Sequence, residues 1–211
     1  MESKLRSGFS IFILSLLTFS ISAQDDQNEI RTLFGNSSNG GYGAFSIGFT
    51  QINQIQAITM GGRGEWIIGH SLGLGFYGSG FMTDFVKTAA DMNYNMVGGH
   101  GGIVIEPILI PRFPVHISFP LMAGIGGIAY AENQQSGFQG NYDAYIKSTD
   151  YFLIAEPGAE LEFNLTRWMR LAIGASYKVT TDIHFKNTLE PIANNALKGI
   201  SGGVTIKFGK F

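Results

Sequence analysis

Residues 150–163 read DYFLIAEPGAELEF and residues 169–180 read MRLAIGASYKVT, and in both segments apolar side chains recur at every second position. Successive side chains of a β-strand point to opposite faces, so this period predicts two strands with two different faces each. Asn164 to Arg167 predict a short turn between them, and hence an antiparallel hairpin. Pro157 has no N–H to donate, which predicts a bulge or a local break in pairing. The first strand places Tyr151, Leu153, Ala155, Pro157, Ala159, Leu161 and Phe163 on one face, and Asp150, Phe152, Ile154, Glu156, Gly158, Glu160 and Glu162 on the other.

The same alternation extends over the chain from Gly40 onward. Earlier strands are predicted near residues 41–51, 54–68, 71–82, 92–106 and 115–131, and a last one over 200–208, which makes about eight. We therefore predict an all-β fold, an eight-stranded antiparallel up-and-down transmembrane β-barrel. In the second strand Ile58, Met60, Trp66 and Ile68 oppose Thr59, Gly61, Arg63 and Glu65, and in the last strand Ile200, Val204, Ile206 and Phe208 oppose Ser201, Gly203, Thr205 and Lys207.

The predicted connections alternate in length. Those after Gly69, Glu106 and Phe163 are short, whereas those around 82–92, 131–149 and 182–196 are longer and polar. The first hairpin, Gln51 to Gln54, is tight and is the one exception. Short periplasmic turns and long outer loops are typical of outer-membrane barrels, so both termini are expected on the periplasmic side. The second short connection holds Pro107, Pro111 and Pro114.

Composition supports a membrane barrel and excludes several classes of protein. Charged residues are only 14% of the chain, hydrophobic residues reach 45%, and 29 of 211 residues are glycine. A net charge of −2 gives no electrostatic basis for binding nucleic acid. The absence of cysteine excludes disulfides, thiolate metal sites, thiol catalysis and lipid attachment through cysteine. The four histidines show no metal-binding spacing, so no metal and no cofactor are expected.

The N-terminus has the features of a secretory signal. Lys4 and Arg6 precede a short apolar run at residues 9–17, and Ala23 provides a small residue before the polar sequence that follows. We predict a cleaved signal peptide over residues 1–23, a periplasmic arm over 24–40 and the barrel over 41–211.

The charged face of the strands is predicted to point into the barrel. It is rich in Gly and Ala, and it carries both signs of charge on neighbouring strands, as buried and paired groups require. An eight-stranded barrel is just wide enough for side chains to fill its interior. A soluble lipocalin-like barrel, with its apolar face inward, is the alternative. In the hairpin, Glu162 or Glu160 should lie near Arg170. The predicted interior network comprises Arg63, Glu65, Glu156, Glu160, Glu162, Arg170 and Lys178.

Aromatic residues on the outward face fall near the two predicted membrane boundaries. Trp66, Phe163 and Phe208 belong to the periplasmic end, and Tyr151 and Tyr177 belong to the outer end. Such aromatic girdles flank the apolar band of membrane barrels.

Two further segments complete a family resemblance, namely Gly101 to Pro107 (GGIVIEP) and Gly202 to Phe211 (GGVTIKFGKF). With the signal peptide and the glycine-spaced strands, the chain resembles the small OmpA/OmpX-type barrels, and it looks like outer-membrane β-barrel proteins of the Bacteroidetes. The resemblance covers about residues 40–211 and implies a Gram-negative outer membrane, with lipids as neighbours. A terminal aromatic is this family's assembly signal. Here Phe211 departs from the pattern, because by parity it shares the face of Lys207.

Three function classes remain open. The leading one is a structural or interaction barrel whose long loops contact protein partners. An enzyme that modifies lipid would need a nucleophile, and His116 and Ser118 share a strand face near Glu106. That pair points inward at the periplasmic end, so we expect no enzyme activity. His100 is expected to form hydrogen bonds inside the barrel. A narrow channel is the third class, and it is disfavoured because the charged side chains should fill the lumen. The oligomeric state stays open.

Overall fold

The computed structural model describes residues 39–87, 93–136, 141–185 and 192–211, and these form strands joined by turns and loops, without a helix. The predicted signal peptide and nearly all of the predicted arm lie outside the described residues. The strands are β1 (Gly40–Ile52), β2 (Ile55–Ile68), β3 (Leu72–Thr83), β4 (Val86–Lys87), β5 (Asn93–Leu109), β6 (Val115–Ser118), β7 (Leu121–Ser136), β8 (Asn141–Asn164), β9 (Met169–Thr180) and β10 (Gly199–Lys210).

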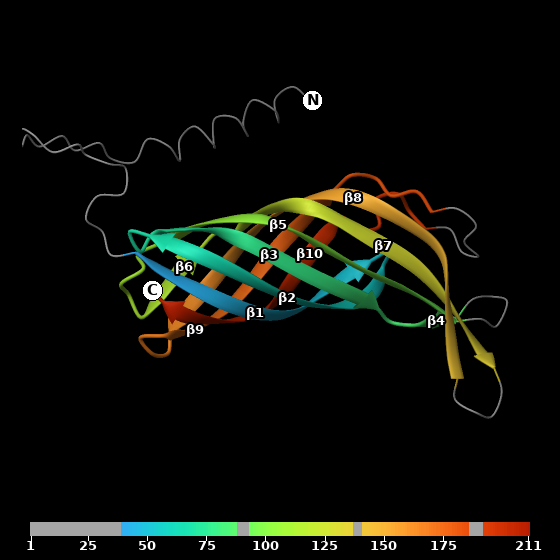
Figure 1. Ribbon diagram of the computed structural model, residues 1–211, viewed down its shortest axis with the longest axis horizontal. Coiled ribbons are helices and arrows are strands. Elements are labelled where there is room, and N and C mark those ends of the chain that lie inside the picture. The colour runs from blue at the N-terminus through green and yellow to red at the C-terminus, as the bar shows by residue number, and fades with distance from the viewer. Residues whose placement is uncertain (1–38, 88–92, 137–140, 186–191) are drawn as a thin grey trace, which may run out of the picture. The chain divides into compact units, whose positions relative to one another are not determined.

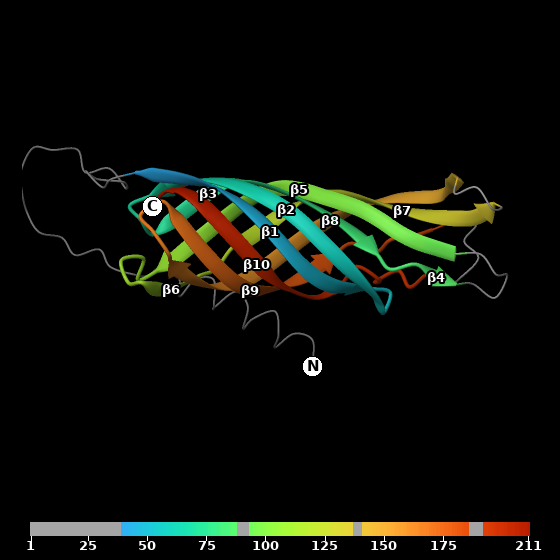
Figure 2. The ribbon, with the colours of Figure 1, turned by 90° about the horizontal axis from the view of Figure 1, so that it is seen from below.

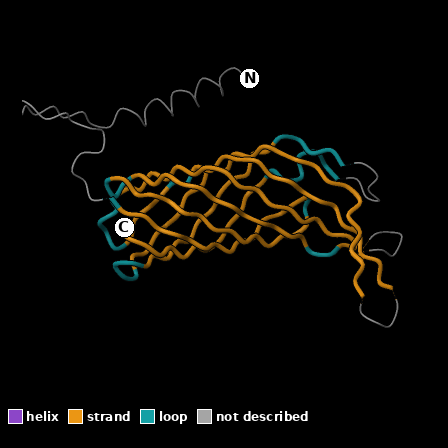
Figure 3. Tube along the Cα trace, in the orientation of Figure 1, coloured by secondary structure: helices purple, strands orange, loops and turns teal. Residues whose placement is uncertain are grey.

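The strands close into an antiparallel barrel (Figure 1). Strands that are adjacent in the ring pair antiparallel, and β1 pairs with β10 from Gly41↔Lys210 to Thr50↔Ser201, which closes the ring. β6 and β7 lie end to end beside β8 and share one place in the ring, while the short β4 pairs only with the end of β5. The ring therefore has eight places, as the sequence predicts. The strands run obliquely to the long axis of the barrel, as closure of a sheet requires (Figure 3).

The two faces of the strands are the predicted ones. Along β8 and β9 the residues predicted as apolar face the outside, and the residues predicted as polar face the lumen. The face prediction is wrong for Ile68, which was grouped with the outward Trp66 but is buried. It is the last residue of β2, where the strand enters the turn and the alternation ends.

One end of the barrel, here called the turn end, holds the described termini and the short connections. Residues 69–71, 110–114 and 165–168 connect strands there, and Gly40 and Phe211 lie at the same end (Figure 1). Gly69 and His70 both have positive φ within the three-residue connection of the β2–β3 hairpin. Asn53 and Gln54 also both have positive φ, and they form a two-residue turn matched to the strand twist at the opposite end, here called the loop end.

At the loop end, β5, β7 and β8 continue past the other strands of the ring (Figure 2). β3 pairs with β5 only as far as Met82↔Val97, and β8 pairs with β9 only as far as Ile154↔Thr180. β7 and β8 nevertheless stay paired to Ser136↔Asn141. The predicted polar loop over 131–149 is therefore wrong for most of its length, because polar residues there continue the hairpin beyond the apolar band.

Pro157 interrupts pairing without shifting the register. β8 and β9 pair at Ala155↔Val179 and again at Gly158↔Ser176, with the same offset on both sides of the proline. The break predicted from the missing N–H is present, and the alternative of a bulge is wrong at this position. The register shift in β8 instead lies opposite Tyr130 and Ala131 of β7.

Candidate functional site

The lumen at the turn end is filled by ionised side chains that converge on Lys207 of β10. Its Nζ lies 2.6 Å from Glu106 Oε1, 2.6 Å from Glu162 Oε1 and 3.0 Å from Glu160 Oε2. The Lys207 side chain is only 1% exposed. An ammonium group has three hydrogen-bond donors, so each donor is matched by one carboxylate. Because the carboxylates come from β5 and β8, the ammonium ties three strands together across the lumen.

Arg63 of β2 joins the same group of side chains. We call this group the carboxylate cluster, and it comprises Glu65, Glu106, Glu160, Glu162, Arg63, Lys207 and Arg170. The guanidinium of Arg63 forms two parallel bonds to Glu160, with Nη1 2.9 Å from Oε1 and Nη2 2.6 Å from Oε2. Arg63 Nη2 also lies 3.3 Å from Glu106 Oε1, and Nε lies 3.1 Å from Glu65 Oε1. The hydroxyl of Tyr42 lies within hydrogen-bond distance of Glu65 and Glu106.

The last residue of the chain closes the cluster at the turn end. Arg170 Nη1 lies 3.3 Å from Glu162 Oε2, and its guanidinium carbon lies 3.9 Å from the centre of the Phe211 ring. That distance is within range of a cation–π interaction. The Phe211 ring also lies 5.7 Å from that of Tyr42. Phe211 thus faces the lumen, in agreement with its sequence parity.

Three carboxylates of the cluster could bind a cation. Oxygen atoms of Glu106, Glu160 and Glu162 all lie within 4.8 Å of one another, and oxygen ligands suit Ca²⁺. The ammonium of Lys207 contacts all three carboxylates and supplies the positive charge there.

The candidate catalytic residues are drawn into this network. Ser118 Oγ donates to Glu106 Oε1 at 2.7 Å, whereas His116 Nε2 lies 3.1 Å from Glu162 Oε2. The other ring nitrogen of His116 lies 3.3 Å from the carbonyl oxygen of Phe113. Nucleophilic catalysis needs a serine hydroxyl bonded to a histidine that a third group orients. Here the serine hydroxyl donates to a carboxylate instead of to the histidine, and both side chains are buried.

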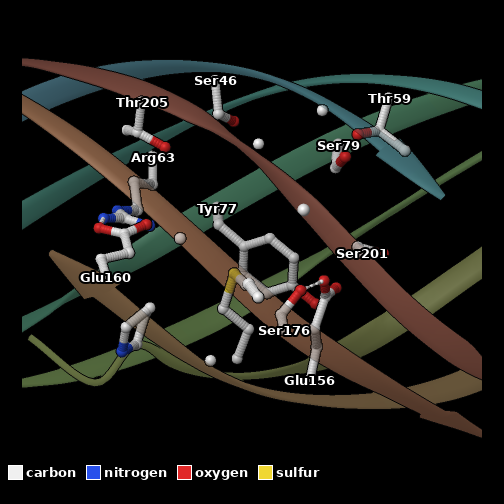
Figure 4. Close-up of a pocket in the computed structure, with 18 of the residues that line it drawn as sticks. Ser46, Thr59, Arg63, Tyr77, Ser79, Glu156, Glu160, Ser176, Ser201 and Thr205 are labelled. Atoms are coloured by element: carbon white, nitrogen blue, oxygen red, sulfur yellow. Dashed lines mark hydrogen bonds and ion pairs between the residues drawn. The ribbon is translucent and has the colours of Figure 1, made fainter.

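A polar chamber lies next along the lumen (Figure 4). It has a volume of about 110 Å³. Glu156 accepts a hydrogen bond from Ser176 at 2.5 Å, and Lys178 lines the same chamber. His100 Nδ1 lies 3.4 Å from the Tyr77 hydroxyl, and its Nε2 lies 3.9 Å from Glu156 Oε2, a separation that suits a bridging water. Hydroxyl groups form the facing wall, namely those of Ser46, Thr59, Ser79, Ser201 and Thr205.

An apolar plug closes the lumen at the loop end. Phe81, Phe152 and Ile154 point inward from the barrel strands, and Ile183 and Leu197 come from the segment between β9 and β10. All are buried. Ile52, Ala57, Tyr94, Met96, Ile128, Tyr130 and Ala196 complete the plug. Among the described residues, the lumen therefore has three successive levels from the turn end to the loop end: a charged level, a polar level and an apolar level.

All seven residues of the predicted interior network lie in the lumen, but at two levels. Arg63, Glu65, Glu160, Glu162 and Arg170 meet in the carboxylate cluster, and Glu156 and Lys178 line the chamber. Of the two glutamates expected near Arg170, Glu162 contacts it, whereas Glu160 pairs with Arg63. The sequence-based network omitted Lys207, Glu106 and Tyr42. The inward parity of Lys207 was visible in the sequence, but its partners on distant strands were not.

No helix within the described ranges is long and apolar enough to cross a membrane.

Neither a protein-family model nor a curated protein sequence matches the chain. Among solved structures, the N-terminal β-barrel domain of Pseudomonas aeruginosa OprF is 10% identical and covers 82% of this chain and 98% of its own, with a TM-score of 0.43. Neisserial surface protein A is 11% identical, covers 82% and 96%, and has a TM-score of 0.46. The attachment invasion locus protein Ail of Yersinia pestis is 12% identical, covers 82% and 97%, and has a TM-score of 0.39.

Proposed function

We propose that this chain is an integral outer-membrane protein with a filled lumen and a structural or interaction role. The observation that supports it is the apolar exterior. Phe76 is 74% exposed, Ile125 69% and Ile200 71%, and they belong to different strands. Apolar patches of this extent on a protein surface mark contact with lipid or with another protein.

The height of the apolar exterior suits a bilayer. On β2 it runs from Ile58 to Trp66, and on β10 from Ile200 to Phe208. These stretches match the roughly 9–11 residues of a tilted membrane-spanning strand. A soluble barrel of the lipocalin kind would have the opposite faces, with its ion pairs in water.

Aromatic side chains mark both edges of the apolar exterior. Trp66, Trp168 and Phe208 are exposed near the turn end, and the rings of Trp168 and Phe208 stack with centroids 5.9 Å apart. Tyr151 and Tyr177 are exposed toward the loop end. Such residues favour the headgroup levels of a membrane. The short turns at the end with both described termini support a periplasmic turn end and an outer loop end.

An interaction role at the loop end is the simplest function for such a barrel. The enzyme alternative is disfavoured because His116 and Ser118 are buried in the carboxylate cluster, where the serine hydroxyl donates to Glu106 instead of to the histidine. The channel alternative is disfavoured because the carboxylate cluster and the plug fill opposite ends of the lumen. The resemblance to Bacteroidetes outer-membrane barrels remains part of this proposal.

Cell fractionation tests the proposal. The full chain, expressed in a Gram-negative host, should stay in the outer-membrane fraction after a urea wash and migrate differently on gels with and without boiling. Recovery as a soluble periplasmic protein without detergent would refute it. Lipid extracts of expressing cells should match those of the empty-vector control. A new lipid species that disappears with Ser118→Ala would instead establish an enzyme.

A further inference from the structure

A groove with a volume of about 860 Å³ lies on the outside of the barrel at the loop end. It runs between the tip of the β1–β2 hairpin, the adjoining ends of β9 and β10, and residues 193–198. Two hydrogen bonds donated by backbone amides hold its walls in place. Asn53 N donates to Ala196 O at 3.1 Å, and Ala193 N donates to Asn53 Oδ1 at 3.2 Å. The hairpin tip and the loop therefore form one fixed structure.

The lower part of the groove belongs to the apolar exterior. Phe49, Tyr177 and Ile200 form its sides, and all three are at least half exposed. Gly202 contributes no side chain, which leaves space between Phe49 and the neighbouring strand. The groove thus continues the surface that we propose to face lipid.

The upper part of the groove is lined by side-chain amides. Gln51, Gln54, Gln56 and Asn195 are exposed there, and none of them has a side-chain hydrogen bond to another described residue. The one cation of the lining, Lys198, is paired with Asp182 at 2.8 Å. That bond lowers the pKa of the Asp182 carboxyl below its usual value. The pair leaves the rim of the groove close to neutral.

We propose that this groove binds the sugar headgroup of a membrane glycolipid. Hydroxyl groups both donate and accept hydrogen bonds, and side-chain amides do the same, whereas an ammonium only donates and a carboxylate only accepts. A rim of amides with a neutralised charge pair therefore suits a polyhydroxyl headgroup better than a phosphate. The apolar sides below it suit the acyl chains of the same molecule. This inference rests on the proposed membrane location.

Lipid enrichment in nanodiscs tests the proposal. The full chain is reconstituted in phosphatidylethanolamine containing equal small amounts of a monogalactosyl diacylglycerol and of phosphatidylglycerol, and native mass spectrometry reports which lipid stays bound. We expect the galactolipid to be retained preferentially. Removal of two rim amides by Gln51→Met with Gln56→Met should reduce that retention roughly tenfold. Phe49→Ala should reduce it similarly, and Phe76→Ala is the matched control, since Phe76 is exposed on β3 away from the groove.

The outcomes separate the two proposals. A chain that enters the nanodisc but retains both lipids equally, or retains them regardless of these variants, overturns the glycolipid site and leaves the membrane proposal intact. Preferential retention of phosphatidylglycerol overturns the glycolipid site as well. Full displacement of the galactolipid by methyl galactoside would show that the groove binds free sugar, and would overturn the proposal that its ligand is a lipid. A chain that fails to enter a bilayer and stays soluble refutes the membrane proposal itself.

Discussion

Replacement of Lys207 by alanine tests the carboxylate cluster most directly. The Lys207 ammonium contacts three carboxylates at 2.6, 2.6 and 3.0 Å, and its side chain is almost fully buried. Breaking a buried ion pair from one side costs about 3–5 kcal/mol, because the remaining charge is left without a partner. Three carboxylates lose their shared cation here, so Lys207→Ala should lower the free energy of unfolding by about 5 kcal/mol, the upper end of that range.

The assay is urea unfolding in lipid vesicles, read by the gel mobility of unboiled samples. Lys178→Ala is the matched control, because Lys178 is also a buried lysine of the lumen but has no ion pair within 4 Å among the described residues. Both variants lose a similar aliphatic stem, so the difference between them reports the three carboxylates. A Lys207→Ala variant no less stable than the Lys178→Ala variant would refute the structural account of the cluster.

Calcium should selectively rescue the Lys207 variant. Without the ammonium, Glu106, Glu160 and Glu162 present oxygen atoms within 4.8 Å of one another, which suits a Ca²⁺ site. Calcium at about 100 times its dissociation constant would restore about 2.7 kcal/mol. Neither the wild-type chain nor Lys178→Ala should respond. Equal responses of all three proteins would show that calcium acts elsewhere.

Three further substitutions test the faces, the lumen contacts and the close packing of strands. Leu161→Arg on the apolar exterior should destabilise the protein in lipid by roughly 2–4 kcal/mol, with Asp84→Arg in a loop as the control, and equal stability would invert the assignment of faces. A double-mutant cycle of Arg170→Met with Glu162→Gln should show coupling of roughly 1–3 kcal/mol, whereas Arg170→Met with Glu156→Gln at the chamber level should be additive, and additivity in both cycles would disprove the Arg170–Glu162 contact. Gly75→Ala places a Cβ 1.9 Å from the Gly64 carbonyl oxygen and should cost roughly 1–3 kcal/mol in unfolding, while Gly78→Ala has no atom within 4 Å and should be silent.

The fold was predictable because a strand repeats its faces every two residues. The alternation from Asp150 to Phe163 gives the direction of each side chain without any knowledge of its neighbours. The contact of Arg170 with Glu162 also followed, since both residues lie close to the same short turn. The type and length of a turn fix the register of a hairpin close to that turn, so a local stretch of sequence is enough to predict such a contact.

Contacts across the lumen were not predictable, because parity gives a direction and not a partner. Glu160 was expected beside Arg170 as readily as Glu162, yet it bonds to Arg63 on a strand elsewhere in the ring. Which side chains meet depends on the stagger of all the strands around the barrel, and a local pattern does not contain that stagger. Parity assigned Lys207 to the correct face, but it could not identify the three carboxylates that Lys207 contacts.

The apolar plug had a signal in the sequence. Phe152 and Ile154 fall on the otherwise polar face of their strand, and the structure buries both in the plug. An apolar residue on the lumen face has no charged partner to satisfy, so it must pack against other apolar groups. The loop residues that meet it, Ile183 and Leu197, lie outside any periodic strand. Their place in the plug therefore depended on the fold of the connection between β9 and β10.

The two ends of the lumen are closed by different chemistry, and this difference bears on where function can reside. The carboxylate cluster joins β2, β5, β8, β9 and β10 through ion pairs such as Arg63–Glu160 and Lys207–Glu106. Displacement of one member therefore leaves the other buried charges without a partner. The plug uses non-directional apolar contacts, and part of it comes from a connecting segment instead of strands. Residues of that kind can be repacked or exchanged at modest cost when their volume is kept. The loop end can therefore change its surface, or accommodate a partner, while the ion pairs at the turn end keep the barrel closed.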